Sequence, residues 1–237
     1  MGWMSQYIIF GGTDSNEMKV RITAMPKSTR AEERTEEVKV PGRNGTLTLM
    51  DGGHKKTYES YTDTIEGVLL PAADEEAVRK WLSGGGWLIR SDTPTKKQRV
   101  RFTDSITYER ISRNTRHRRF KATMKMQPLK YEVNQTLQTL YLSPSYLMNP
   151  GTLESEPVIT VYGRGDVTLS VNGKTLHLFQ LDGKITIDSE LGDAYKDNLL
   201  MNHKTRGEFP ELAERKNLLE WVGDVDKIEV LPNWRWL

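Results

Sequence analysis

The sequence of 237 residues contains no cysteine. This absence excludes disulfides, thiolate metal sites and cysteine nucleophiles. Histidine is also scarce, and His54, His117, His177 and His203 do not stand at the short spacings that are typical of metal ligands. The sequence therefore predicts no metal site built on these side chains.

Long apolar runs are missing as well. No stretch approaches the roughly 20 apolar residues of a transmembrane helix. Residues 1–10 lack both the basic start and the apolar run of a signal peptide. We expect the chain to be made and folded in a cytoplasm without membrane insertion. Apolar residues, tyrosine included, make up 36% of the sequence, a low share that suits strands with one buried face and one wet face.

No catalytic motif accompanies the many acidic residues. Asp188 with Glu190, and Asp224 with Asp226, are close pairs in the sequence. A glycosidase holds its two carboxyls about 5–10 Å apart in a cleft, and nothing in the flanking sequence marks either pair as such a site. Solvated loop acids are the favoured interpretation. We predict that the chain is not an enzyme and has no catalytic residue, no bound metal and no cofactor.

The sign of the charge differs between the two halves of the chain. Residues 1–131 hold 24 Lys and Arg against 16 Asp and Glu, a net charge of +8. Residues 132–237 hold 10 against 16, a net charge of −6, which leaves +2 for the whole chain. Such a change indicates two modules with different surroundings.

The first module is predicted to consist of strands with one helix. Apolar and polar side chains alternate in residues 17–24 and most clearly in residues 119–127, and a period of two places the apolar ones on one face of a strand. Further strands are expected at 38–40 and 46–49 around a turn at 41–45, as a pair across 56–70, and at 87–89.

A single helix is predicted at residues 75–82. Asp74 can cap its start, and acidic residues precede basic ones, as the helix dipole favours. Val78, Trp81 and Leu82 stand at i, i+3 and i+4 and should face the core. Three glycines at 84–86 end the helix.

The second module is predicted to be a β-sandwich without helices. Asn172-Gly173 between two apolar runs is a strong hairpin signal, and residues 163–166, which contain Arg-Gly-Asp, are interpreted as a turn between two strands. Several short strands at such spacing are typical of a sandwich. They are expected at residues 158–162, 167–171, 175–179, 184–188 and 228–231.

A basic run between residues 113 and 125 holds six Lys and Arg. Nucleic-acid binding would need aromatic or base-reading groups beside such a patch. The charges are expected partly in a loop and partly on the wet face of a strand. We therefore predict no specific nucleic-acid binding. The run forms either a solvated face or an interface with an acidic neighbour, and Arg116, Arg118 and Arg119 are the candidates for that interface.

Three segments resemble the distal tail proteins of siphophages. The turn at residues 41–45, Pro-Gly-Arg-Asn-Gly, is similar to the family's V-P-G-R-x-G segment. Residues 149–163 are similar to the N-x-G-x-x-x-S-x-P-x-I-x-I-x-G start of its C-terminal domain, and residues 207–237 are similar to its G-x-F-P-x-L … G-x-N … P-R-W-R ending. The order and spacing of these segments cover nearly the whole chain.

The resemblance implies a mainly β protein with an N-terminal β-sandwich that carries one α-helix and a C-terminal galectin-like or carbohydrate-binding-module-like β-sandwich. It implies a ring-forming domain at residues 1–140, a connector at 141–156 and a peripheral domain at 157–237. The partners would be other copies in a hexameric ring, the major tail-tube protein and the tail-associated lysin or tail-tip protein. The location would be the tail tip, or baseplate, of a virion or prophage particle.

One alternative stays open at this point. The C-terminal sandwich could instead hold host cell-wall glycans for an accessory protein of the tail tip. Aromatic platforms beside polar groups form many sugar sites, and Trp221, Trp234 and Trp236 are the candidates. Trp234 and Trp236 at i, i+2 could equally close the core.

Overall fold

The computed structural model describes residues 6–27, 31–50, 56–103, 106–113 and 115–237. It divides into two compact units, the first formed by residues 1–133 with Leu237 and the second by residues 134–236. The mainly β fold class that the sequence predicts is confirmed. The helices of the described residues are too short, and not apolar enough, to cross a membrane.

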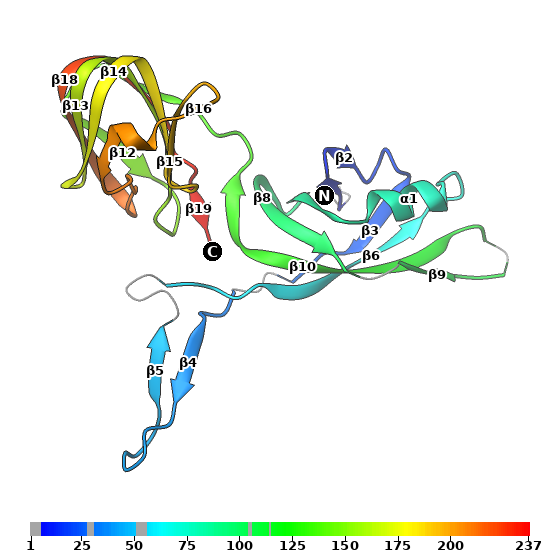
Figure 1. The fold of residues 1–237 in the computed structure, drawn as a ribbon. Coiled ribbons are helices and arrows are strands. Elements are labelled where there is room, and N and C mark those ends of the chain that lie inside the picture. Colours follow the sequence, from blue (N-terminus) through cyan, green and yellow to red (C-terminus); the bar gives the residue numbers. More distant parts are fainter. Residues whose placement is uncertain (1–5, 28–30, 51–55, 104–105, 114) are drawn as a thin grey trace. The chain divides into compact units, whose positions relative to one another are not determined.

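The first unit is built on an antiparallel sheet (Figure 1). Its strand order is β2-β1-β7-β8-β10-β6-β3, and β9 also pairs with β10. The bounds are β1 Ile8–Phe10, β2 Thr13–Asp14, β3 Val20–Ala24, β6 Tyr61–Leu69, β7 Gly85–Arg90, β8 Thr93–Phe102, β9 Thr107–Arg110 and β10 Arg118–Glu132.

The strand β10 confirms the predicted alternation. Phe120, Ala122, Met124 and Met126 are at most 2% exposed and lie in the core of the first unit. The basic residues between them, such as Lys121 and Lys125, lie on the exposed face. Since side chains of a strand point alternately to opposite faces, one strand contributes both to the core and to the wet surface.

The predicted helix is also confirmed, as α1 Glu75–Trp81. The Asp74 carboxylate accepts hydrogen bonds from the backbone N–H groups of Glu76 and Ala77, which satisfies two donors of the first turn. Val78 and Leu82 are buried, and the Trp81 indole N–H donates to the carbonyl of Phe10 over 3.0 Å. The helix is thereby fixed to β1.

The first unit differs from the prediction in two places. Residues 56–70 contain one strand of the main sheet, β6 at Tyr61–Leu69, and not a strand pair, and its neighbours β3 and β10 come from distant parts of the sequence. Residues 93–102 form the strand β8, which was not predicted. Most basic and polar side chains of β8 lie on its less buried face. The buried face carries Val100, Phe102 and one polar residue, Gln98.

The turn at residues 41–45 connects two strands that form a sheet of their own, β4 Thr35–Val38 and β5 Leu47–Met50 (Figure 1). Gly42 and Gly45 have φ angles of 81° and 82°, which glycine adopts without strain. We call residues 35–50 the β4–β5 arm.

The second unit is a β-structure around three long strands, β13 Val158–Val171, β14 Lys174–Asp188 and β18 Arg215–Leu231. Its strand order is β11-β18-β13-β14-β15-β16, with β12 on β18 and β17 on β14. Its core holds residues such as Ile159, Leu169 and Leu219. The remaining elements are β11 Gln138–Leu140, β12 Ser145–Asn149, β15 Asp193–Lys196, β16 Leu199–Leu200, β17 Thr205–Gly207, β19 Arg235–Trp236 and the 3-10 turn η1 Asn202–Lys204.

The predicted hairpin at Asn172-Gly173 connects β13 to β14, and both residues have positive φ, at 52° and 84°. The predicted turn at residues 163–166 is wrong. This segment lies inside β13 and contains irregular pairing on both sides. A Cβ at Gly163 would lie 2.1 Å from the Asp224 carbonyl oxygen, so the glycine permits close strand approach and not chain reversal.

Residues 134–156 include β11 and β12, and both strands pair with β18 of the second unit. Part of the segment expected as a connector therefore contributes hydrogen-bonded strands to this sheet. Apolar and polar residues mix there without clear period, which is why the pattern alone did not indicate strands.

Gly67 tests the packing of the first core. It lies opposite Phe120 across β6 and β10, and a Cβ at this position would lie 2.5 Å from the Phe120 ring. Gly67→Ala should lower the free energy of unfolding of the first unit by about 1–3 kcal/mol, because the ring is buried and cannot move aside cheaply. Urea denaturation read by hydrogen exchange in residues 6–133 measures this change.

The matched control is Gly85→Ala in β7 of the same sheet. A Cβ there would meet its nearest atom at 3.6 Å, an ordinary contact. Its stability should stay near that of the native chain. Equal stabilities of the two variants would contradict the steric interpretation.

Candidate interaction surfaces

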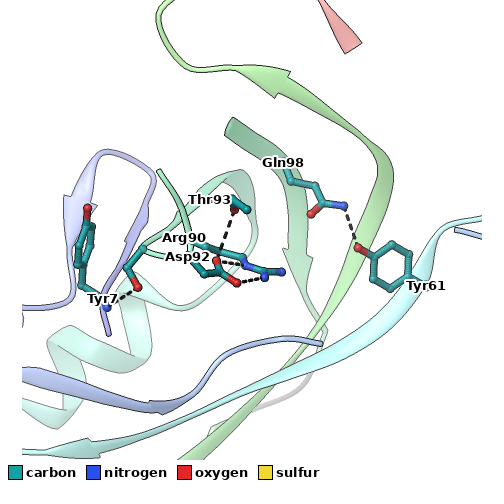
Figure 2. Close-up of polar contacts among 7 residues, drawn as sticks. Tyr7, Tyr61, Arg90, Asp92, Thr93 and Gln98 are labelled. Atoms are coloured by element: carbon teal, nitrogen blue, oxygen red, sulfur yellow. Dashed lines mark hydrogen bonds and ion pairs between the residues drawn. The ribbon is translucent and has the colours of Figure 1, made fainter. Parts of the chain in front are cut away.

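A polar cluster lies where β7 turns into β8 (Figure 2). Arg90 is 6% exposed at the end of β7, and its Nε donates to Asp92 Oδ1 over 2.8 Å. A second contact joins the guanidinium to Oδ2, so the pairing uses both carboxylate oxygens. This hydrogen bonding to Arg90 lowers the pKa of Asp92 below its ordinary value of 3.8.

Neighbouring polar contacts connect this turn region to other strands. The Gln98 amide donates to the Tyr61 hydroxyl over 3.0 Å, which connects β8 to β6 (Figure 2). It also donates to the Gln127 carbonyl over 2.6 Å, which connects β8 to β10. The Tyr7 backbone N–H donates to the Ser91 hydroxyl over 3.2 Å. Buried polar groups with partners of this kind fix the strands in register.

Two lysines beside Arg90 have lowered pKa values. Burial lowers the pKa of Lys96, and burial followed by the charges of Arg90 and Lys96 lowers that of Lys130. The cavity that these residues line has a volume of about 20 Å³, which is room for one water molecule. This cluster therefore stabilises the β7–β8 turn and does not offer a substrate site.

The three predicted interface arginines do not lie together. Arg118 and Arg119 are consecutive in β10, so their side chains point to opposite faces of the strand. Arg118 and Arg116 both line a cavity of about 550 Å³ in the first unit, and Arg119 does not. The cavity also includes Arg113, which belongs to the predicted basic run but not to the predicted interface, and Arg110, which lies outside that run.

The three candidate tryptophans are packed against the core of the second unit. Trp234 is 7% exposed, and Trp221 and Trp236 are half-buried. Trp234 therefore lacks the open ring face that stacking on a sugar requires. Glycan binding by these residues stays a prediction.

Among the predicted histidines and acidic pairs, His177 and Asp188 form local hydrogen bonds. His54 lies outside the described residues, and His177 shares a 3.1 Å hydrogen bond with the Thr168 hydroxyl. Asp188 accepts from the backbone N–H groups of Glu190 and Leu191, which is a turn contact. Within the part of the chain that the structure describes, no three His, Asp or Glu side chains form a group that could hold a metal.

The whole chain has the fold of a known phage protein. The solved structure of Dit from phage SPP1 superposes with a TM-score of 0.70 and covers 99% of this chain and 100% of its own, at 12% sequence identity. That structure is described as a paradigm of the hub adsorption apparatus in phages that infect Gram-positive bacteria. No family model matches the sequence, and no curated protein does.

The Arg90–Asp92 pair yields a pH-dependent prediction. Because the folded chain lowers the pKa of Asp92, the pair adds stability above the unfolded pKa and loses it as the pH falls through the folded pKa. The Asp92 side chain is 45% exposed, so solvent weakens the effect. Asp92→Asn should lower the free energy of unfolding by about 1 kcal/mol at pH 7.

As the pH falls below 3.8 and then through the lower pKa of the folded chain, the difference between Asp92→Asn and the native chain should shrink, and it should disappear below the folded pKa, where the carboxyl is protonated in both the folded and the unfolded chain. Urea denaturation at a series of pH values measures this difference in the free energy of unfolding. The control is Glu17→Gln, which removes an exposed carboxylate of the same unit. A loss of stability in Asp92→Asn that persists unchanged at low pH would contradict the role of the ion pair.

Proposed function

We propose that this chain is a non-enzymatic structural protein of a siphophage or prophage tail. In this proposal it is a distal tail protein whose copies form a hexameric hub ring between the tail tube and the tail tip. The observation that carries the proposal is the likeness to SPP1 Dit, because it extends over both units and nearly every residue of both chains. A likeness confined to one sandwich would support much less, since sandwiches serve many functions.

The β4–β5 arm supports self-association. Leu47 and Leu49 lie on one face of β5 and are 38% and 44% exposed, and Val40, just before the turn, is 39% exposed. In the described residues no strand outside the arm pairs with β4 or β5. A two-stranded hairpin without a covering layer is marginally stable in water.

The base of the arm is better fixed than its tip. Backbone hydrogen bonds of 2.8 Å join Arg34 to Thr57 and Glu59 to Glu32, and Arg34 forms an ion pair with Glu59 over 2.8 Å. A hairpin that is anchored at its base and exposes apolar side chains such as Leu47 and Leu49 beyond it is suited to lie on another protein surface. In a ring, that surface is supplied by the adjacent copy.

The remaining assignments follow from the same proposal. The first unit would build the ring. The second unit, which contains the predicted connector 141–156 with its strand β12, would form the peripheral sandwich. The major tail-tube protein and the tail-associated lysin or tail-tip protein would contact the two sides of the ring. The protein would be located at the tail tip of the particle.

The direct experiment is native mass spectrometry of the full chain with negative-stain electron microscopy. We expect a closed ring of six copies with an axial hole. A chain that stays monomeric at the highest concentration tested, and also in lysates that contain the tube protein, would contradict the proposal.

The role of the arm is tested by Leu47→Ser with Leu49→Ser. Both side chains are exposed, so each folded copy should keep its stability, whereas the ring should dissociate because the buried apolar contact between copies is lost. The control is Leu199→Ser with Leu200→Ser, which removes an exposed leucine pair from β16 of the second unit. Rings in both double variants would contradict this role for the arm.

A further inference from the structure

The cavity of the first unit that contains the arginines has an unbalanced charge. Its volume is about 550 Å³, within the range of ligand pockets. Four arginines line it, and Glu75 is the acidic residue among the lining residues. The arginines are Arg110, Arg113, Arg116 and Arg118.

The fold itself brings these positive charges together. Arg110 in β9 lies directly opposite Arg118 in β10, and like charges in such cross-strand pairs are destabilising. Arg113 and Arg116 come from the loop between the two strands. Within that loop, the Thr115 backbone N–H donates to the Ser112 carbonyl over 3.4 Å, and Ile111 donates to His117.

The positive charge is largely uncompensated inside the described chain. Glu75 forms an ion pair with Arg118. Arg110, Arg113 and Arg116 have no carboxylate within ion-pair distance among the described residues. Arginine does not lose its proton in proteins, so these residues cannot relieve the repulsion by becoming neutral. A bound anion relieves it directly.

The lining of the cavity favours carboxylates on a protein segment over nucleic acid. Guanidinium groups bind carboxylates with two parallel hydrogen bonds. Leu70 and Pro71 add an apolar strip to the wall, which suits the carbon chains of acidic side chains. Among the described residues, no aromatic side chain lines the cavity, so these residues offer no stacking platform of the kind that single-stranded nucleic acids use.

We infer that this cavity binds an acidic segment of another protein chain, which presents two or more carboxylates to Arg110, Arg113, Arg116 and Arg118. The inference does not depend on ring formation, since the cavity lies within the first unit of one copy. It extends the predicted acidic-neighbour interface to two further arginines and removes Arg119 from it.

Fluorescence anisotropy with a labelled hexaglutamate peptide and the full chain tests the inference. Arg113→Gln with Arg116→Gln should weaken binding by about tenfold or more, because two charge-assisted contacts are lost. The matched control is Arg21→Gln with Arg101→Gln, which removes the same charge from exposed strand positions of the first unit. This control should change the affinity by no more than about twofold.

A third variant should act in the opposite direction. Glu75→Gln removes the internal partner of Arg118 and should tighten peptide binding by about threefold, since a competing carboxylate is lost. A gain of affinity cannot be explained by partial unfolding. Circular dichroism checks that all variants remain folded.

Four results would overturn the inference. Three of them are absence of binding to the native chain, equal loss of affinity in the two double variants, and failure of Glu75→Gln to tighten binding. A fourth is binding of a six-nucleotide oligothymidylate that matches the peptide in affinity and is lost in Arg113→Gln with Arg116→Gln. That result would assign the cavity to nucleic acid.

Discussion

The first unit depends on the burial of one face of β10. This strand pairs with β6, β8 and β9, and its four buried residues from Phe120 to Met126 form the centre of the core. The neighbouring strand β6 has Gly67 opposite Phe120, where a Cβ would clash with the buried ring. The helix α1 is held to the same unit by Trp81. The wet face of β10 carries basic side chains as a direct result of the same alternation.

Local sequence signals predicted the elements that depend on local physics. The cap at Asp74, the Asn172-Gly173 hairpin and the alternation of β10 all rest on residues a few positions apart. The strand β8 was missed because its charged side chains obscure an apolar face that ends at Val100 and Phe102. Strand pairing between β6 and its distant neighbours depends on register over many residues, which no local pattern encodes.

The arginine cavity, too, could be predicted only in part from the sequence. The basic run was visible in the sequence, but a run does not show which side chains share a face. Arg118 and Arg119 separate because they are consecutive in a strand, and Arg110 joins Arg118 through the β9–β10 register. The exposed leucines of the β4–β5 arm were likewise visible as a strand, whereas the lack of a covering layer was not.

The two basic clusters of the first unit balance their charge in different ways. At the β7–β8 turn, Asp92 pairs with the buried Arg90, and burial lowers the pKa of Lys96 and Lys130. In the arginine cavity, the guanidinium groups stay charged and Glu75 forms an ion pair with Arg118. Positive charge that no carboxylate of the chain pairs can be balanced by an anion from outside. The same fold therefore contains one cluster that stabilises a turn and one that is suited to recognise an anionic partner.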